Sequence, residues 1–135
     1  MKHRTTMLLA FALLAGLIGL CPGPVQAGPV YLVRITGAIT PANAGFLKKA
    51  IHQAEDENAG CLIVMLDTPG GLADAMREMV MAIYDSRVPV VVFVAPEGSR
   101  AASAGAFITL AAHVAAMAPG TNIGSASPVQ MGGAQ

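Results

Sequence analysis

The chain has 135 residues and a mass of 13.7 kDa, which suits one domain and leaves no room for two. Hydrophobic residues make up 54% of the chain and the mean hydropathy is +0.59, which excludes a disordered polar chain. The 8 Lys and Arg residues balance the 8 Asp and Glu residues, so no excess of charge is available to attract nucleic acid.

The first 27 residues have the layout of a secretory signal peptide. Basic residues at Lys2–Arg4 precede the apolar run Met7–Leu20. As a helix this run would span about 21 Å, which is short of the roughly 30 Å hydrocarbon core of a bilayer. The helix-breaking segment Pro22–Pro24 follows, and Val25 and Ala27 then stand at positions −3 and −1 of a cleavage site. We therefore expect cleavage after Ala27 and export of the protein to the cell envelope.

Two alternatives exist for this N-terminal segment. Cys21 would suit a lipoprotein, but Leu20 stands where the lipidation motif requires Gly or Ala. A buried N-terminal helix agrees less well than export with the basic start and the Pro/Gly exit. A signal peptide over residues 1–27 leaves residues 28–135 as the folded domain.

The first predicted strand and helix follow at residues 30–60. Val30–Ile35 is rich in β-branched residues and stops before Gly37, which is typical of a strand. Thr40 and Pro41 form a helix-start signal, with Thr as N-cap and Pro in the first turn. The apolar positions recur at helical spacing: Leu47, Ala50, Ile51 and Ala54. We interpret the polar residues between them as a solvated face: Lys48, Gln53, Glu55 and Glu57.

Strands and helices continue to alternate beyond residue 60. Cys61–Leu66 is a continuous apolar run, as expected of a strand buried on both faces of a parallel sheet. A helix with apolar positions from Leu72 to Ile83 follows, then a strand at Val88–Val94. We predict a small-residue helix at Ala101–Ala112 and a short strand at His113–Met117. This alternation predicts a layered α/β fold.

Two loops between a strand and a helix carry the candidate chemistry. In the first, Asp67–Gly71, adjacent glycines allow a sharp turn whose N–H groups can face a ligand. A plain strand-to-helix turn remains the alternative for this loop. No GxGxxG motif marks a dinucleotide site and no CxxC motif a metal or redox site, so we expect neither cofactor nor metal.

The second loop, Gly98–Gly105, contains Ser103 among small neighbours that leave its hydroxyl accessible. A serine at a helix N-terminus is favoured by the helix dipole when it carries developing negative charge. The alternative is a serine that only caps the helix. Considered together, the two loops could supply a glycine N–H and the N–H that follows Ser103 to hold a tetrahedral oxyanion.

Three segments resemble, in order and in approximate spacing, motifs of the NfeD-type membrane-bound serine proteases of the ClpP class: Asp67–Gly71, Arg100–Gly105 and Ala118–Gly124. The continuation Ser125–Val129 is similar as well, so the resemblance extends from Val30 to Val129. Each motif alone is weak, but the three in this order are specific.

The resemblance implies a layered ClpP/crotonase-like α/β fold with mostly parallel buried strands. It implies a serine endopeptidase of the Ser-Lys dyad type with Ser103 as nucleophile. Gly71 and Ala104 would donate the oxyanion-hole N–H groups, and Gly70 and Gly71 would line the bound peptide. It also implies a stomatin-like membrane partner, substrates with apolar stretches in membrane-associated proteins, and a homo-oligomer.

The sequence departs from the family in its catalytic base. The family uses a lysine a few dozen residues after the serine, but Lys2, Lys48 and Lys49 all precede Ser103. His113 is a possible substitute, although ten residues of helix would carry its side chain away from the hydroxyl. We therefore expect a truncated N-terminal part of a protease domain, with its fold incomplete at the C-terminus.

The sequence is compatible with three functions. The first is a serine endopeptidase, and the second is a catalytically silent module that binds a stomatin-like membrane protein. The third is a crotonase-type acyl-CoA enzyme, since that fold also builds an oxyanion hole from two backbone N–H groups. The predicted signal peptide argues against the third, because CoA substrates are cytoplasmic.

Overall fold

A computed structural model describes residues 28–126, so the predicted signal peptide and the segment 127–135 lie outside the described residues. The described part is an α/β fold built on a four-stranded parallel sheet with the order β1-β2-β3-β5. The strands of this sheet are β1 (Val30–Thr36), β2 (Cys61–Asp67), β3 (Val90–Val94) and β5 (Val114–Met117). The helices are α2 (Pro41–Asp56), α3 (Ala73–Tyr84) and α4 (Ala104–Ala111). A second, two-stranded parallel sheet pairs β4 (Arg100–Ala102) with β6 (Asn122–Gly124).

Helix α2 begins where the sequence predicts. Thr40 is the N-cap in extended conformation and Pro41 occupies the first turn. The backbone N–H of Thr40 donates to the Asn43 side chain at 2.9 Å, and the Asn43 N–H donates to the Thr40 hydroxyl at 3.5 Å. This reciprocal capping box satisfies two N–H groups that the helix itself cannot pair.

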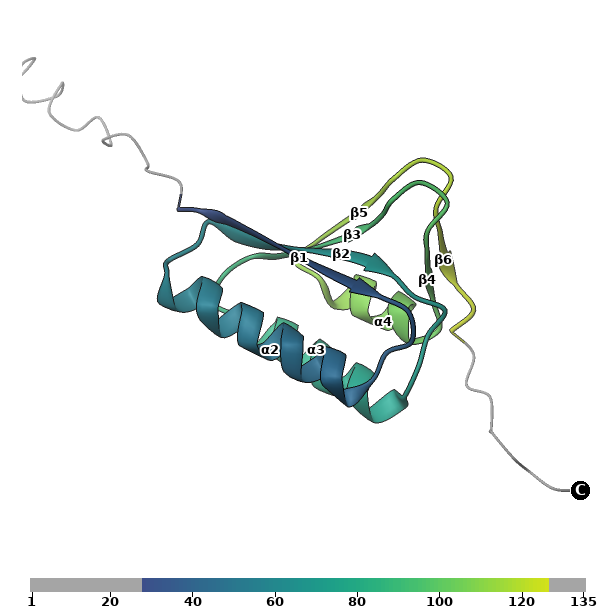
Figure 1. The fold of residues 1–135 in the computed structure, drawn as a ribbon, viewed down its shortest axis with the longest axis horizontal. Coiled ribbons are helices and arrows are strands. Elements are labelled where there is room, and N and C mark those ends of the chain that lie inside the picture. The colour runs from purple at the N-terminus through teal and green to yellow at the C-terminus, as the bar shows by residue number, and fades with distance from the viewer. Residues whose placement is uncertain (1–27, 127–135) are drawn as a thin grey trace, which may run out of the picture.

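All three helices lie on one side of the four-stranded sheet (Figure 1). The core lies between these layers, where alternate residues of the strands, such as Leu62, Val64 and Leu66, are fully buried. The helices contribute Leu47, Met79, Ile83 and Ile108, which are fully buried as well. Because parallel strands end at the same edge, this packing brings the loops after β2 and β3 to one end of the molecule.

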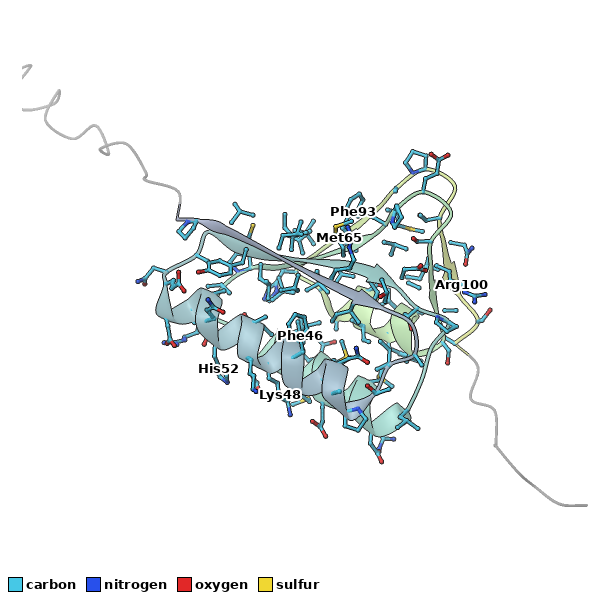
Figure 2. The ribbon with its side chains drawn as sticks, in the orientation of Figure 1. Phe46, Lys48, His52, Met65, Phe93 and Arg100 are labelled. Carbon is cyan, nitrogen blue, oxygen red and sulfur yellow. The ribbon has the colours of Figure 1, made fainter. Side chains whose placement is uncertain are left out.

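Among residues 28–126, no helix or strand covers the opposite face of the sheet. The expectation that strand Cys61–Leu66 is buried on both faces is therefore wrong. In β2 the residues Cys61, Ile63 and Met65 alternate with the buried ones and are only partly buried. Figure 2 shows Met65 and Phe93 on the side of the sheet away from α2. We call this surface the open face; Arg34 lies on it beside Met65, and its apolar residues are Val30, Leu32, Cys61, Ile63, Met65, Val91, Phe93, Val114 and Ala116.

The segment after β3 also differs from the prediction. The helix expected at Ala101–Ala112 begins only at Ala104, because Arg100–Ala102 forms strand β4. Strand β4 pairs with Thr68 on one side and with β6 on the other. These tertiary hydrogen bonds override the helix propensity of alanine. The β4–β6 pair runs across the end of the main sheet (Figure 1).

The other predicted elements are confirmed with small shifts. Strand β3 begins at Val90 rather than Val88, and β5 covers Val114–Met117. Within residues 28–126, every helix is too short or too polar to cross a membrane.

Candidate active site

The two loops that the sequence singles out lie side by side at the carboxyl ends of the strands. The Thr68 N–H donates to the Arg100 carbonyl at 2.7 Å, and the Ala102 N–H donates to the Thr68 carbonyl at 3.0 Å. The carboxylate of Asp67 accepts the Arg100 N–H at 3.0 Å. These bonds join the end of β2 to β4, which leads directly into Ser103.

Ser103 occupies a sharp turn between β4 and α4. Its backbone has φ 52° and ψ −114°, a positive φ that residues other than glycine rarely adopt. Its N–H donates to the Gly124 carbonyl at 2.8 Å, so β6 holds the turn in place. A strained serine between a strand and a helix is the arrangement that exposes the nucleophile of many hydrolases.

The interpretation of Ser103 as a plain capping residue is wrong. Ser103 stands at the N-cap position of α4, but its side chain makes no capping hydrogen bond. Among residues 28–126 its hydroxyl has no recorded hydrogen-bond partner, although the residue is half-buried. The hydroxyl is therefore free to engage a ligand.

Gly70 lies directly against Ser103. Gly70 has φ 117°, and a Cβ added to it would lie 2.7 Å from the Ser103 Cβ and 3.3 Å from the Ser103 Oγ. A side chain here would collide with the serine and strain the backbone. The structure thus brings one glycine of the first loop into contact with the serine of the second.

Gly71 is held by the segment that precedes α2. The Ile39 N–H donates to the Gly70 carbonyl at 2.8 Å, and the Leu72 N–H donates to the Ile39 carbonyl at 3.0 Å. A side chain on Gly71 would overlap the Ile39 backbone. No described residue accepts a hydrogen bond from the N–H of Gly71 or from that of Ala104, the first residue of α4. Both donors remain available for an anion near the helix N-terminus.

The histidine and the lysines that could serve as a catalytic base lie far from Ser103. His113 is at the opposite end of the sheet, where its Nδ1 accepts the Val90 N–H at 3.1 Å. Lys48 forms an ion pair with Glu78 at 2.7 Å, on the side of α2 away from the sheet (Figure 2). Lys49 is exposed on the same helix. Neither His113 nor these lysines is placed to accept the Ser103 proton.

Shifted pKa values occur away from Ser103, at the amino ends of the strands. The Arg87 backbone N–H, at 2.7 Å, and then its guanidinium, at 3.1 Å, hold the pKa of Glu55 below its ordinary value. A hydrogen bond with Glu57 raises the pKa of Tyr31 and lowers that of Glu57. The Glu55 side chain is only 7% exposed, so its assignment to a solvated face is wrong.

Two grooves lie on the helix layer rather than beside Ser103. One, of about 420 Å³, is lined by residues of α2 and α3, and another, of about 260 Å³, by residues of α3 and α4. Residues 28–126 contain no group of three His, Cys, Asp or Glu side chains able to hold a metal ion.

A family model described as the NfeD1b N-terminal domain matches residues 29–135. The chain belongs to this family. It is 47% identical over 100 residues to the membrane-bound protease PH1510 of Pyrococcus horikoshii, and 36% identical over 100 residues to the membrane protein NfeD1b of Bacillus subtilis. Each alignment covers 74% of this chain but only 23% and 22% of the relative, so the chain spans about a quarter of their length.

Solved structures agree with this family and its fold. Two mutants of the 1510-N membrane-bound stomatin-specific protease, one with a serine and one with a lysine replaced by alanine, give TM-scores of 0.76 and 0.75 at 42% and 45% identity. These comparisons cover 82% and 78% of this chain and 55% and 48% of the solved chains; the lysine mutant is in complex with a substrate peptide. A ClpP1 mutant from Listeria monocytogenes gives a TM-score of 0.61 at 25% identity, with 68% of this chain and 54% of that chain covered. These comparisons confirm the predicted ClpP-like α/β fold.

Proposed function

We propose that this chain carries the nucleophile and oxyanion hole of a serine endopeptidase. The observation that carries the proposal is the strained turn at Ser103, with φ 52°, in contact with Gly70 of the other loop. A free hydroxyl, the N–H of the next residue, Ala104, and the N–H of Gly71 in the adjoining loop are together the minimal set of groups for acyl transfer.

In the proposed reaction the Oγ of Ser103 attacks the carbonyl carbon of a peptide bond and gives its proton to a general base. The carbonyl oxygen becomes an oxyanion, which the N–H groups of Gly71 and Ala104 bind. Collapse of this intermediate breaks the C–N bond, and the amine leaves with a proton from the base. Water then attacks the acyl-serine, which releases the acid and restores the hydroxyl.

We assign the base to a lysine of the Ser-Lys type, supplied from beyond residue 135. No lysine follows Ser103 in the sequence, and Lys48 and Lys49 lie on α2. The solved relatives support this assignment, because this chain covers only about half of each, and a serine and a lysine were the residues chosen for replacement there.

The substrate that we propose is a peptide segment of a membrane-associated protein, rich in apolar residues and bound along Gly70 and Gly71. The relatives support this proposal, since they are named as membrane-bound and as specific for stomatin or a stomatin homologue. We further propose that the protein has a stomatin-like partner, that it is exported to the cell envelope and that it forms a homo-oligomer.

A second candidate is a catalytically silent module that binds a stomatin-like protein. This candidate applies if no lysine of the complete protein reaches Ser103, because serine without a proton acceptor is a poor nucleophile. The two candidates differ in whether Ser103 can be acylated.

Labelling with a fluorophosphonate probe tests the proposal in the protein made from its full reading frame. We expect the probe to modify Ser103, and Ser103→Ala to abolish labelling and peptide cleavage, a loss of several orders of magnitude. Ser86→Ala is the matched control, because Ser86 lies at the other end of the sheet and donates its hydroxyl to the Val88 carbonyl. Cleavage by the Ser103→Ala protein at the wild-type rate would disprove the endopeptidase assignment, and absence of labelling in the wild type would favour the silent module.

A further inference from the structure

Thr68 contacts three segments of the candidate site: the glycine loop, strand β4 and the first turn of α4. It follows β2 directly, and its side chain is completely buried. We infer that Thr68 is the positioning residue of this site: it fixes the glycine loop against the turn that carries Ser103. This inference rests on the proposed function, because it assigns a role within the same reaction.

The hydroxyl of Thr68 holds the glycine loop. Its Oγ1 accepts the Gly70 N–H at 3.0 Å and donates to the Gly70 carbonyl at 3.1 Å. Gly70 has φ 117°, a conformation that an unrestrained glycine would readily leave. The same carbonyl also accepts the Ile39 N–H, so only the Gly70 N–H depends on Thr68 for its partner among the described residues. The hydroxyl thereby holds the peptide that joins Pro69 to Gly70, and together with the Ile39 N–H it holds the carbonyl of the peptide that joins Gly70 to Gly71.

The backbone of Thr68 holds strand β4. Its N–H and carbonyl bond the Arg100 carbonyl and the Ala102 N–H, at 2.7 Å and 3.0 Å. These two bonds set the position of Ala102, and therefore of the strained turn that begins at Ser103. Thr68 is thus bonded both to the glycine loop and to the strand that leads into the serine, while Ile39 and Gly124 support the loop and the turn from outside.

The methyl group of Thr68 packs against the first turn of α4. A Cβ added to Gly105 would lie 2.5 Å from the Thr68 Cγ2, so this glycine is the residue that admits the methyl group. The helix whose N-terminus presents the Ala104 N–H is therefore seated on Thr68. The hydroxyl holds the glycine loop and the methyl group supports the helix that presents the Ala104 N–H. Variants that remove one group at a time can therefore separate the two contributions.

Thr68→Val removes the hydroxyl and keeps the shape of the side chain, whereas Thr68→Ser keeps the hydroxyl and removes the methyl group. The test measures fluorophosphonate labelling and peptide cleavage by the protein made from its full reading frame. For Thr68→Val we expect kcat and the maximal labelling rate to fall about 10- to 100-fold, because a donor displaced by about 1 Å loses most of its effect. We expect KM to change less than about threefold, since a positioning defect acts on the transition state. Thr68→Ser should recover the rate to within about threefold of wild type, because it restores the hydroxyl bonds to Gly70.

Thr109→Val is the matched control. Thr109 is also buried, and its hydroxyl donates to a glycine carbonyl, that of Gly105 at 2.8 Å, but within helix α4. We expect this variant to label at the wild-type rate. An equal loss in both valine variants, or no recovery in Thr68→Ser, would overturn the positioning role and indicate a general cost of removing a buried hydroxyl.

The two hypotheses fail in different ways. If Ser103→Ala abolishes labelling while Thr68→Val labels like wild type, the proposed function stands and the role of Thr68 is refuted. If Ser103→Ala still labels and cleaves, the proposed function fails, whatever Thr68→Val does. Thermal unfolding of each variant identifies any loss that reflects misfolding, and the recovery in Thr68→Ser then decides the role of the hydroxyl.

Discussion

Ser103 adopts a backbone conformation that costs free energy in the folded state. A positive φ at a residue with a Cβ costs about 1–3 kcal/mol, and φ is 52° at Ser103. The Ser103 N–H bonded to Gly124 and the pairing of Ala102 with Thr68 keep the turn in this conformation. At the residue scale, the fold accepts a cost in stability at the serine of the candidate site.

This strain can be measured by comparing two inactive variants. Ser103→Gly should be more stable than Ser103→Ala by about 1 kcal/mol, because glycine adopts positive φ without a steric cost. Denaturant unfolding of both proteins measures the difference, and both should fail to label with the probe. Equal stability of the two variants would show that the turn is not strained, and the strain argument for Ser103 would be lost.

At the scale of elements, the C-terminal end of α2 is tied to the loop before β3. Glu55 of α2 accepts the backbone N–H of Arg87 and pairs with its guanidinium. Because these contacts lower the pKa of Glu55 in the folded state, they stabilise the fold above the ordinary pKa of a glutamate. The contribution is lost as pH falls through the lowered pKa, since the carboxyl is then protonated in both states.

Glu55→Gln should therefore destabilise the fold at pH 7 by about 0.5–1 kcal/mol, the range of a partly exposed ion pair. The difference from wild type should shrink as the pH falls below the ordinary pKa of a glutamate and through the lowered pKa of Glu55, where the wild-type side chain also loses its charge. Thermal unfolding over a pH series measures both effects. Glu78→Gln is the control: its pair with Lys48 is exposed on both sides, 52% and 43%, so it should cost less. A pH-independent difference for Glu55→Gln would refute the linkage.

At the scale of the whole molecule, the open face is the most unusual feature of the described part. Parallel sheets are ordinarily covered on both faces, yet Val30, Leu32 and Val114 are 61%, 59% and 53% exposed here. A largely apolar surface of this kind, with Arg34 as its charged residue, favours association. We expect the 135-residue chain, made by itself, to associate and to lack activity, because it also has no lysine after Ser103.

The double variant Leu32→Glu and Val114→Lys tests the role of the open face in association. Both side chains are already more than half exposed, so the fold should lose less than about 1 kcal/mol while size-exclusion chromatography shifts towards the monomer. Leu110→Glu is the matched control, since Leu110 is 76% exposed but lies on helix α4. A monomer produced by the control and not by the double variant would place the contact on the helix layer instead.

The sequence by itself determined the elements whose signals are local. Each predicted strand and helix has a counterpart, because period, caps and breakers act within a few residues, as with Thr40 and Pro41 at the start of α2. It also located both loops of the candidate site and the family. Contacts between distant residues could not be predicted in this way, which is why β4 was assigned to a helix and Glu55 to a solvated face.

Only the tertiary structure decided how the two loops meet. The positive φ of Ser103, its contact with Gly70 and the burial of Thr68 all depend on pairing between β2 and β4. A threonine two residues before a glycine is a turn signal, but nothing local shows that its backbone will hold a strand that follows about thirty residues later. The open face was equally hidden, because a strand half-covered by helices and one covered on both sides have the same apolar run. The physical reason is common to these cases: side-chain burial and tertiary hydrogen bonds are properties of pairs of segments, and local propensity acts on one segment alone.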